Sequence, residues 1–522
     1  MNYQIVARML STVTTLIGTT MLFSLPWAHP KLGYREGLPT PDAIEWRGFW
    51  ALLGSTAICF IVGAILRRAG RHAKGKLYRK EAMAVVGLSW VLATILGSLP
   101  YSLAGVARDN GVPMSVVDSL FESQSGFSTT GATVISDLEN YKNVPHCLLF
   151  WRSSTHFLGG LGIIVLFVVV LGRGSAGKAL MRNEMPGPSH DNSTARMQHL
   201  AWQFAGTYFA FNLVLALILR LHDLSWFDAF CHAFATMATG GFSTYNASIG
   251  HFQSESIDYI IVIFMLLAGT NFTLLYFAFM GRPGRLFRDI EFRVYIGIIV
   301  IATLLVLFYC FGNLSAGTAG GAQSWRAAIR YGLFQVVSIV TTTGFGTHDF
   351  DKWNNVGRAT LLALMFVGGC AGSTGGGMKV IRHILFFKVL HREMEKAYHP
   401  TVIRPLKLAG KPLDSPDLSH GILVYFSLIL ILFMISWGAV VCFEPDSTWG
   451  DDGPSHKLID SASAVISNLN NIGPGLGTVG ATQNYGHFSW WTKLNFIFLM
   501  MVGRLEIFPV LVLVLPGFWR RR

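Results

Sequence analysis

Four short segments rich in glycine, threonine and serine decide the fold. They read Ser128-Thr-Thr-Gly-Ala-Thr133, Ala238-Thr-Gly-Gly-Phe-Ser243, Thr341-Thr-Thr-Gly-Phe-Gly346 and Asn470-Asn-Ile-Gly-Pro-Gly475. Aligned on their central glycines, the segments recur every roughly 100 to 130 residues, which indicates an internal repeat. Each follows a stretch too short to cross a bilayer, so each repeat is predicted to contain a helix, a re-entrant loop and a second helix.

An acidic residue supports the register of this repeat. Asp118, Asp228 and Asp460 each stand thirteen positions before a central glycine, and Tyr331 takes that position in the third repeat. We expect these aspartates near the N-termini of the short helices, where they would complement the helix dipole. There they could also attract cations to the mouth of a pore.

The segments themselves suit a small cation. Irregular backbone at membrane depth is tolerated only where protein or water surrounds it. Glycine lets successive carbonyls turn the same way, and four such segments in a ring could replace the water shell of an ion, as potassium-channel filters do. Outer turns carry similar clusters, but four copies in register favour a pore.

The composition is that of a membrane protein. Hydrophobic residues make up 52% of the 522 residues and charged residues 13%, against about 25% charged in soluble domains. The first apolar run lacks a convincing cleavage site, so we expect a retained helix instead of a signal peptide. The predicted membrane spans are residues 9–28, 48–67, 81–103, 148–172, 199–221, 258–280, 293–312, 358–388, 419–442 and 489–517.

The placement of charge predicts the orientation. Basic residues give a net charge of +12 and gather in the loops at 67–80, 282–293 and 382–411 and in the tail. The positive-inside rule therefore places both termini in the cytoplasm, and no nucleic-acid partner is needed to explain the charge. The predicted units are two N-terminal helices in 1–78, followed by pore repeats at 79–180, 195–282, 286–395 and 415–522.

The eighth predicted span is interrupted by glycines. Each glycine costs a helix about 1 kcal/mol relative to alanine, so we expect an unwound loop below the glycine segments. A phosphate-binding loop is disfavoured, because Met378 separates Gly377 from Lys379 and the flanks are apolar. The interruption comprises Gly368, Gly369, Cys370, Ala371, Gly372, Ser373, Thr374, Gly375, Gly376 and Gly377.

One arginine lies inside the last apolar run. A charge at that depth costs at least ~2.5 kcal/mol on insertion scales, so Arg504 should face a pore or a partner group. It could pair with Glu506 or with helix carbonyls. Alternatively, it could lie just below the glycine segments and raise the barrier to cations.

These motifs resemble the Trk/Ktr/HKT superfamily of potassium transporters, in its TrkH and TrkG branch. The resemblance covers nearly the whole chain, including the two additional N-terminal helices. It implies an all-α fold of four parallel helix–loop–helix repeats around one pore, with the glycine-rich interruption and Arg504 acting as an intramembrane gate. Potassium would be bound at Thr129, Thr130, Gly131, Thr239, Gly240, Gly241, Thr342, Thr343, Gly344, Asn471, Ile472 and Gly473.

The match is not complete in the segments themselves. No repeat has the full TVGYG of tetrameric channels, so we expect fewer well-formed sites and weaker discrimination among monovalent ions. Gly131 stands where some sodium-selective relatives have serine, and it resembles the potassium-passing type.

The resemblance also implies partners. It predicts a homodimer of two separate pores in the cell inner membrane, surrounded by lipid, and a cytosolic nucleotide-binding subunit of the TrkA kind. Potassium would be the transported and bound ion, with no covalently bound cofactor.

Two other functions were weighed. An enzyme is disfavoured because the sequence has no HExxH or GxSxG motif and no paired catalytic groups within the apolar runs. A symporter coupled to protons or sodium usually has inverted repeats and buried ionisable relays, whereas these repeats run parallel. Passive, gated permeation is therefore the primary prediction, and coupled transport is the alternative.

Overall fold

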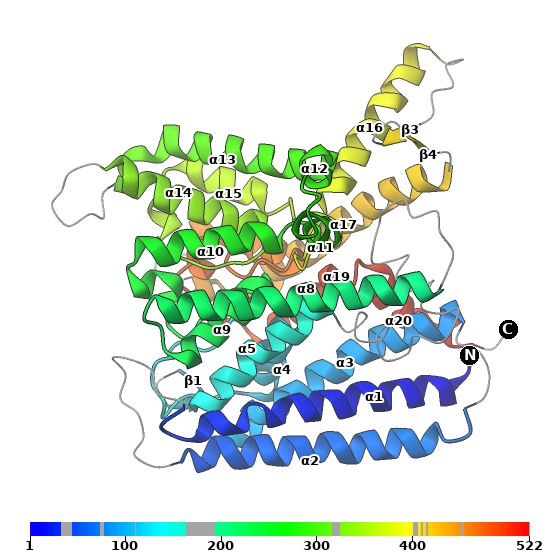
Figure 1. The fold of residues 1–522 in the computed structure, drawn as a ribbon, viewed down its shortest axis with the longest axis vertical. Coiled ribbons are helices and arrows are strands. Elements are labelled where there is room, and N and C mark those ends of the chain that lie inside the picture. Colours follow the sequence, from blue (N-terminus) through cyan, green and yellow to red (C-terminus); the bar gives the residue numbers. More distant parts are fainter. Residues whose placement is uncertain are drawn as a thin grey trace.

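The protein is almost entirely helical. The computed structural model describes residues 1–32, 44–73, 78–109, 111–162, 194–315, 324–399, 406–408, 411–413, 416–449 and 454–520. Within these residues, strands occur only as two short hairpins. Long helices run side by side across the molecule, from left to right in Figure 1.

The fourfold repeat is visible in the order of the helices. Each repeat has a long first helix, a short re-entrant helix and a second helix. The first helices are α3 (Arg79–Ala104), α8 (Thr194–Leu221), α13 (Ile290–Ser315) and α17 (Pro416–Phe443). The re-entrant helices are α4 (Val116–Phe127), α9 (Trp226–Met237), α14 (Trp325–Val340) and α18 (Pro454–Leu469). The second helices are α5 (His146–Leu161), α10 (Glu255–Ala268) with α11 (Phe272–Phe279), α15 (Asn355–Leu364) with α16 (Val380–Tyr398), and α19 (Trp490–Arg504) with α20 (Phe508–Val514).

The repeats pack in a ring. Each re-entrant helix lies against the first helix of its own repeat. In addition, α5 packs on α9, α10 packs on α14, and α19 packs on α4. In the first, second and fourth repeats the second helix thus supports the re-entrant helix of the next repeat, and the α19–α4 contact joins the last repeat to the first. From the third repeat, α16 packs instead on α17, the first helix of the fourth repeat.

Two further helices cover the first repeat. The first apolar run forms α1 (Tyr3–Leu22), which packs along α2 (Trp46–Ala69), and both contact α3. Glycines allow α1 and α2 to approach closely: a Cβ atom added to Gly18 would lie 2.8 Å from the Cβ of Cys59. Close contact through small residues is the usual way helices associate in a bilayer.

Six described helices are long and apolar enough to cross a membrane alone. They are Tyr3–Ala28, Trp46–Ala69, Lys80–Ala104, Ala201–Leu221, Ile290–Gly312 and Ser419–Phe443. A seventh span would be α10 with α11, which meet at an angle of 108°.

The second helices differ from the predicted continuous spans. A straight span at 258–280 is wrong, because the side chain of Asn271 accepts the N–H groups of residues 273 and 274 and starts a new helix. A straight span at 489–517 is also wrong, because left-handed backbone at Glu506 and Ile507 separates α19 from α20. Of the breaks in the second helices, only the one in 358–388 was predicted. Residues 163–180 of the first predicted repeat lie outside the described residues.

The remaining elements are short connections. The Tyr3 hydroxyl donates to the carbonyl of Trp519 at 3.0 Å, so the two ends of the described chain lie together (Figure 1). The short helices are η1 (Leu25–Ala28), η2 (Ser248–Phe252), α12 (Gly284–Arg288), η3 (Phe350–Lys352), η4 (Asp446–Trp449), η5 (Gly477–Val479) and α21 (Pro516–Trp519). The antiparallel hairpins pair β1 (Ala107–Asp109) with β2 (Val112–Pro113) and β3 (Leu406–Leu408) with β4 (Lys411–Leu413).

Candidate functional site

The re-entrant helices deliver the four glycine segments (residues 128–133, 238–243, 341–346 and 470–475) to one place. Helix α4 begins with a capping box, in which the Ser115 hydroxyl accepts the Asp118 N–H and the Asp118 carboxylate accepts the Ser115 N–H. In α9, the Ser225 hydroxyl caps the N–H of Asp228 in the same way. Each helix ends directly before its glycine segment, so the negative end of each helix dipole faces that segment.

The backbone of the four segments follows one pattern. The residue two positions before each central glycine is left-handed, with φ between 52° and 58°, at Thr129, Thr239, Thr342 and Asn471. The four central glycines are left-handed as well. Positive φ is uncommon outside glycine, so its recurrence at equivalent positions shows that the segments share one strained geometry.

The amide hydrogens of the segments turn back toward their own helices. The N–H groups of Thr130, Gly240, Thr343 and Ile472 donate to carbonyls in the last turn of α4, α9, α14 and α18 at 2.8–2.9 Å. A trans peptide group points its carbonyl opposite to its N–H, so the preceding carbonyls point away from the helices. Within the described chain, no hydrogen-bond donor contacts these carbonyls.

The four central glycines form a closed ring. A Cβ atom added to Gly131 would lie 2.1 Å from the carbonyl oxygen of Gly240, and one on Gly241 would lie 2.0 Å from that of Thr343. The cycle continues from Gly344 to the carbonyl of Ile472 at 2.0 Å, and it returns from Gly473 to that of Thr130 at 2.6 Å. Each repeat therefore touches the next, and no side chain fits at any central glycine.

The second and fourth repeats depart from the Thr-Thr-Gly pattern, and contacts in the structure account for both departures. A Cβ atom on Gly240 would lie 2.5 Å from the ring of His156, which occupies the space that a threonine would need. In the fourth repeat, the side-chain amide of Asn471 donates to the Thr130 hydroxyl at 3.0 Å and to the Met500 carbonyl at 2.9 Å. Asn471 thereby links the last repeat to the first.

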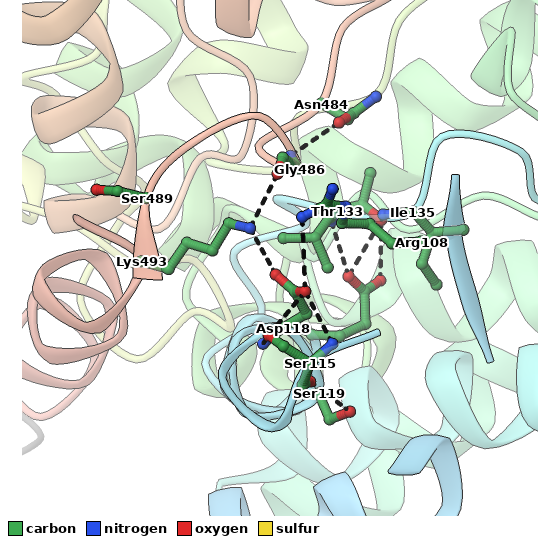
Figure 2. Close-up of polar contacts among 12 residues, drawn as sticks. Arg108, Ser115, Asp118, Ser119, Thr133, Ile135, Asn484, Gly486, Ser489 and Lys493 are labelled. Carbon is green, nitrogen blue, oxygen red and sulfur yellow. Dashed lines mark hydrogen bonds and ion pairs between the residues drawn. The ribbon is translucent and has the colours of Figure 1, made fainter. Parts of the chain in front are cut away.

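The three aspartates of the repeat are all buried. Asp118 accepts a hydrogen bond from Lys493 of α19 at 2.5 Å, as Figure 2 shows, and Asp228 accepts one from the Thr244 hydroxyl at 2.7 Å. Asp460 accepts the N–H of Thr478 at 2.9 Å. Placing Asp460 at a helix N-terminus is wrong, because α18 begins at residue 454. All three carboxylates hold neighbouring backbone or side chains.

The Asp118–Lys493 pair makes a stability prediction. Lys493→Met should lower the stability by roughly 3 kcal/mol, because the buried Asp118 carboxylate loses its close cation and keeps only the more distant Arg108, at 3.9 Å. Thermal unfolding in detergent measures the loss. Lys457→Met is the control, because its partner Asp446 is 68% exposed and such pairs contribute little. Equal losses in both variants would contradict this role for the buried pair.

The glycine-rich loop (residues 368–377) lies directly against the glycine segments. The N–H of Gly376 donates to the Thr342 hydroxyl at 2.8 Å. A Cβ atom on Gly377 would lie 3.1 Å from the carbonyl of Asn470. The Thr374 hydroxyl donates to the carbonyl of Met237 at 2.9 Å. The loop thus contacts the end of α9 and the segments of the third and fourth repeats.

Arg504 joins this loop to the first repeat. Its guanidinium donates to the carbonyl of Thr374 at 2.7 Å and to that of Gly159 at 2.6 Å. Glu506, which we considered as a partner, forms an ion pair with Arg382. The positive charge therefore lies beside the loop, at the end of α5.

Comparison with known proteins assigns the family. A family model described as "TrkH: Cation transport protein" matches residues 51–519. The chain belongs to the TrkH family. Among its relatives, "Trk system potassium uptake protein TrkH" of Escherichia coli is 35% identical over 527 residues and covers all of both chains. "Trk system potassium uptake protein TrkG" of the same organism is 30% identical and covers 85% of this chain and 86% of its own length.

A solved TrkH structure has the same fold. The crystal structure of the potassium transporter TrkH from Vibrio parahaemolyticus matches with a TM-score of 0.82 and 33% identity over the full length of both chains. The predicted all-α membrane fold and the predicted TrkH-type membership are confirmed.

Two charged contacts of this TrkH-family site were missed from the sequence. Glu122 and Arg152 form a fully buried pair at 2.5 Å. Glu122 also accepts the N–H of Val134, and Arg152 donates to the carbonyl of Ser243, so the pair joins the ends of the first two glycine segments. The one signal in the sequence was Arg152, a single base directly after the apolar run Leu148–Trp151.

Lys379 is the second missed cation. It is buried at the end of the glycine-rich loop and donates to the carbonyl of Gly375 within it. Like Arg504, it brings a positive charge to the loop.

An aspartate also links the third and fourth repeats of the TrkH-family fold. Asp351 accepts the N–H of Gly477 at 2.8 Å. Burial raises the pKa of the Asp351 carboxyl to about 6, and the nearby Asp349 and Asp460 act in the same direction. At neutral pH this carboxyl is therefore mostly ionised, and the link between the two repeats carries a negative charge.

Proposed function

We propose that this chain takes up potassium across the cell membrane by gated, largely passive permeation. The observation that carries the proposal is the closed ring of four glycines, with carbonyl oxygens turned away from the supporting helices. Carbonyl oxygens in a ring can replace the hydration shell of a monovalent cation. The relatives described above carry names of potassium uptake proteins, which favours potassium as the ion.

The predicted filter residues are proposed as the ion-binding sites. Thr129, Thr239, Thr342 and Asn471 would supply one layer of carbonyls. Thr130, Gly240, Thr343 and Ile472 would supply the next, directly before the central glycines. The threonine hydroxyls already have protein partners, so backbone oxygen would dominate the binding.

The glycine-rich loop and Arg504 are proposed as the gate. The loop touches the third and fourth glycine segments, and its contacts bring two cations, Arg504 and Lys379, close to the path below them. A cation entering that region would meet like charge, and like charge raises its energy. Moving the loop aside would therefore open the path.

The proposal extends to partners and location. The names of the relatives describe a "Trk system", which favours assembly with other Trk components. We propose a homodimer with a nucleotide-binding subunit on the cytosolic side. The proposed location is the inner membrane with both termini cytoplasmic, which agrees with the basic loops at 67–80 and 282–293.

Two experiments test this function. Expression in cells without their own potassium uptake systems should restore growth at low potassium. In voltage-clamped proteoliposomes, the reversal potential should follow the potassium gradient alone. A reversal potential that shifts with pH would instead favour a coupled symporter, and no growth rescue would count against potassium uptake itself.

A further inference from the structure

The break in the second helix of the second repeat fits against the glycine-rich loop. Between α10 and α11, the carbonyl of Gly269 accepts the N–H of Cys370 at 2.8 Å, and the N–H of Phe272 donates to the carbonyl of Gly372 at 3.0 Å. The bend of 108° exposes backbone groups that a continuous helix would use internally. The loop satisfies these groups.

Asn271 stands at the centre of this contact. Its side-chain oxygen accepts the N–H groups of Thr273 and Leu274 and so caps α11. Its side-chain amide donates to the carbonyl of Ala371 at 2.7 Å. One asparagine therefore starts a helix of the second repeat and holds the loop of the third.

Glu291 holds the same loop from a different helix. One oxygen of its carboxylate accepts the N–H of Ala371 at 2.8 Å and that of Ile381 at 2.9 Å. Glu291 is buried, and the start of α13 does not need it as a cap, because Asp289 accepts the N–H of Phe292. Both bonds of Glu291 go to the loop and to the helix that follows it.

Together these side chains fix one residue of the loop on both sides. The carbonyl of Ala371 is held by Asn271 and its N–H by Glu291. Glycine-rich backbone has little conformational preference of its own, so its position depends on such external contacts.

We propose that Asn271 and Glu291 are positioning residues that clasp the glycine-rich loop in its closed position. Opening requires release of this clasp, which makes the broken helix α10–α11 part of the gating machinery. The inference rests on the proposed function, because it takes the loop to be the gate.

The test is basal uptake of radioactive rubidium into proteoliposomes that hold the full chain alone. Asn271→Asp keeps the cap of α11 and replaces the donor to Ala371 with a carboxylate oxygen that repels this carbonyl, so uptake should rise at least roughly 5- to 10-fold. Glu291→Ala removes two charge-assisted bonds and should raise uptake roughly 10- to 100-fold. Glu291→Gln keeps an acceptor oxygen and should have a smaller effect than Glu291→Ala.

The control is Asp289→Asn, which removes a charge at the same helix end but keeps the cap and touches no loop residue. Its uptake should equal that of the wild type, and the ratio of rubidium to sodium uptake should stay constant in all variants. Unchanged or reduced uptake in both Asn271→Asp and Glu291→Ala, with intact elution and melting profiles, would overturn the clasp. If loss of Arg504 raises uptake while these variants do not, only the clasp fails; if loss of Arg504 also has no effect, the proposed gate fails.

Discussion

Gly344→Ala is expected to abolish potassium uptake. The added Cβ would lie 2.0 Å from the carbonyl oxygen of Ile472, and the residue has φ of 79°, which is strained for any side chain. The carbonyl must move by about 1 Å or more, and displacement on that scale costs a precise site roughly 100-fold. Growth at low potassium and rubidium uptake both measure the loss.

Gly332→Ala is the matched control for the glycine substitution. Gly332 lies within α14 of the same repeat, and a Cβ atom there would meet only ordinary contacts at 3.5 Å or more. Uptake should stay close to that of the wild type. If Gly344→Ala transported potassium as well as Gly332→Ala does, the ring of glycines could not be the filter.

Arg504→Ala is expected to raise potassium flux in the absence of any regulatory subunit. The substitution removes two charge-assisted hydrogen bonds, to the carbonyls of Thr374 and Gly159. If these bonds favour the closed loop by about 2 to 3 kcal/mol in total, the rare open population rises roughly 30- to 150-fold. It also removes a positive charge from the path. Rubidium uptake into proteoliposomes at fixed protein density measures the change.

Arg220→Ala serves as the control for Arg504. Arg220 lies in the last turn of α8 beside the ring of Trp226, far in sequence from the loop, and its loss should leave flux unchanged. A flux in Arg504→Ala that matches the wild type would show that the arginine has only a structural role.

The glycine segments could be predicted from the sequence because their backbone conformation restricts which residue types fit at each position. A left-handed position accepts asparagine or glycine readily and threonine only under constraint, and the ring leaves no room for side chains at the central positions. The break at 368–377 was readable for a similar reason, because so many glycines cannot hold a helix. In both cases the signal is local.

The contacts of Asn271 and Glu291 with the glycine-rich loop, and the breaks in the other second helices, could not be predicted from the sequence. They depend on contacts between residues that are far apart in the chain. Gly269, Thr270 and Asn271 interrupt the apolar run only briefly, and only the helix that begins after Asn271 reveals its capping role. Glu291 looks like an ordinary acid at a helix start, although its hydrogen bonds lie about eighty residues away along the chain. For Asp460 the sequence pattern itself misled. Its spacing to the central glycine matches that of Asp118 and Asp228, but α18 begins at residue 454, so Asp460 lies inside the helix.

The contact between Lys493 and Asp118 spans 375 positions of the chain, and this separation has a consequence for biogenesis. The first re-entrant helix is synthesised long before α19 exists, so Asp118 lacks its close partner Lys493 while the intervening helices enter the bilayer. Such distant contacts make assembly slow and leave intermediates exposed. Chains truncated before residue 493 should therefore insert their earlier helices and yet fail to complete the central channel.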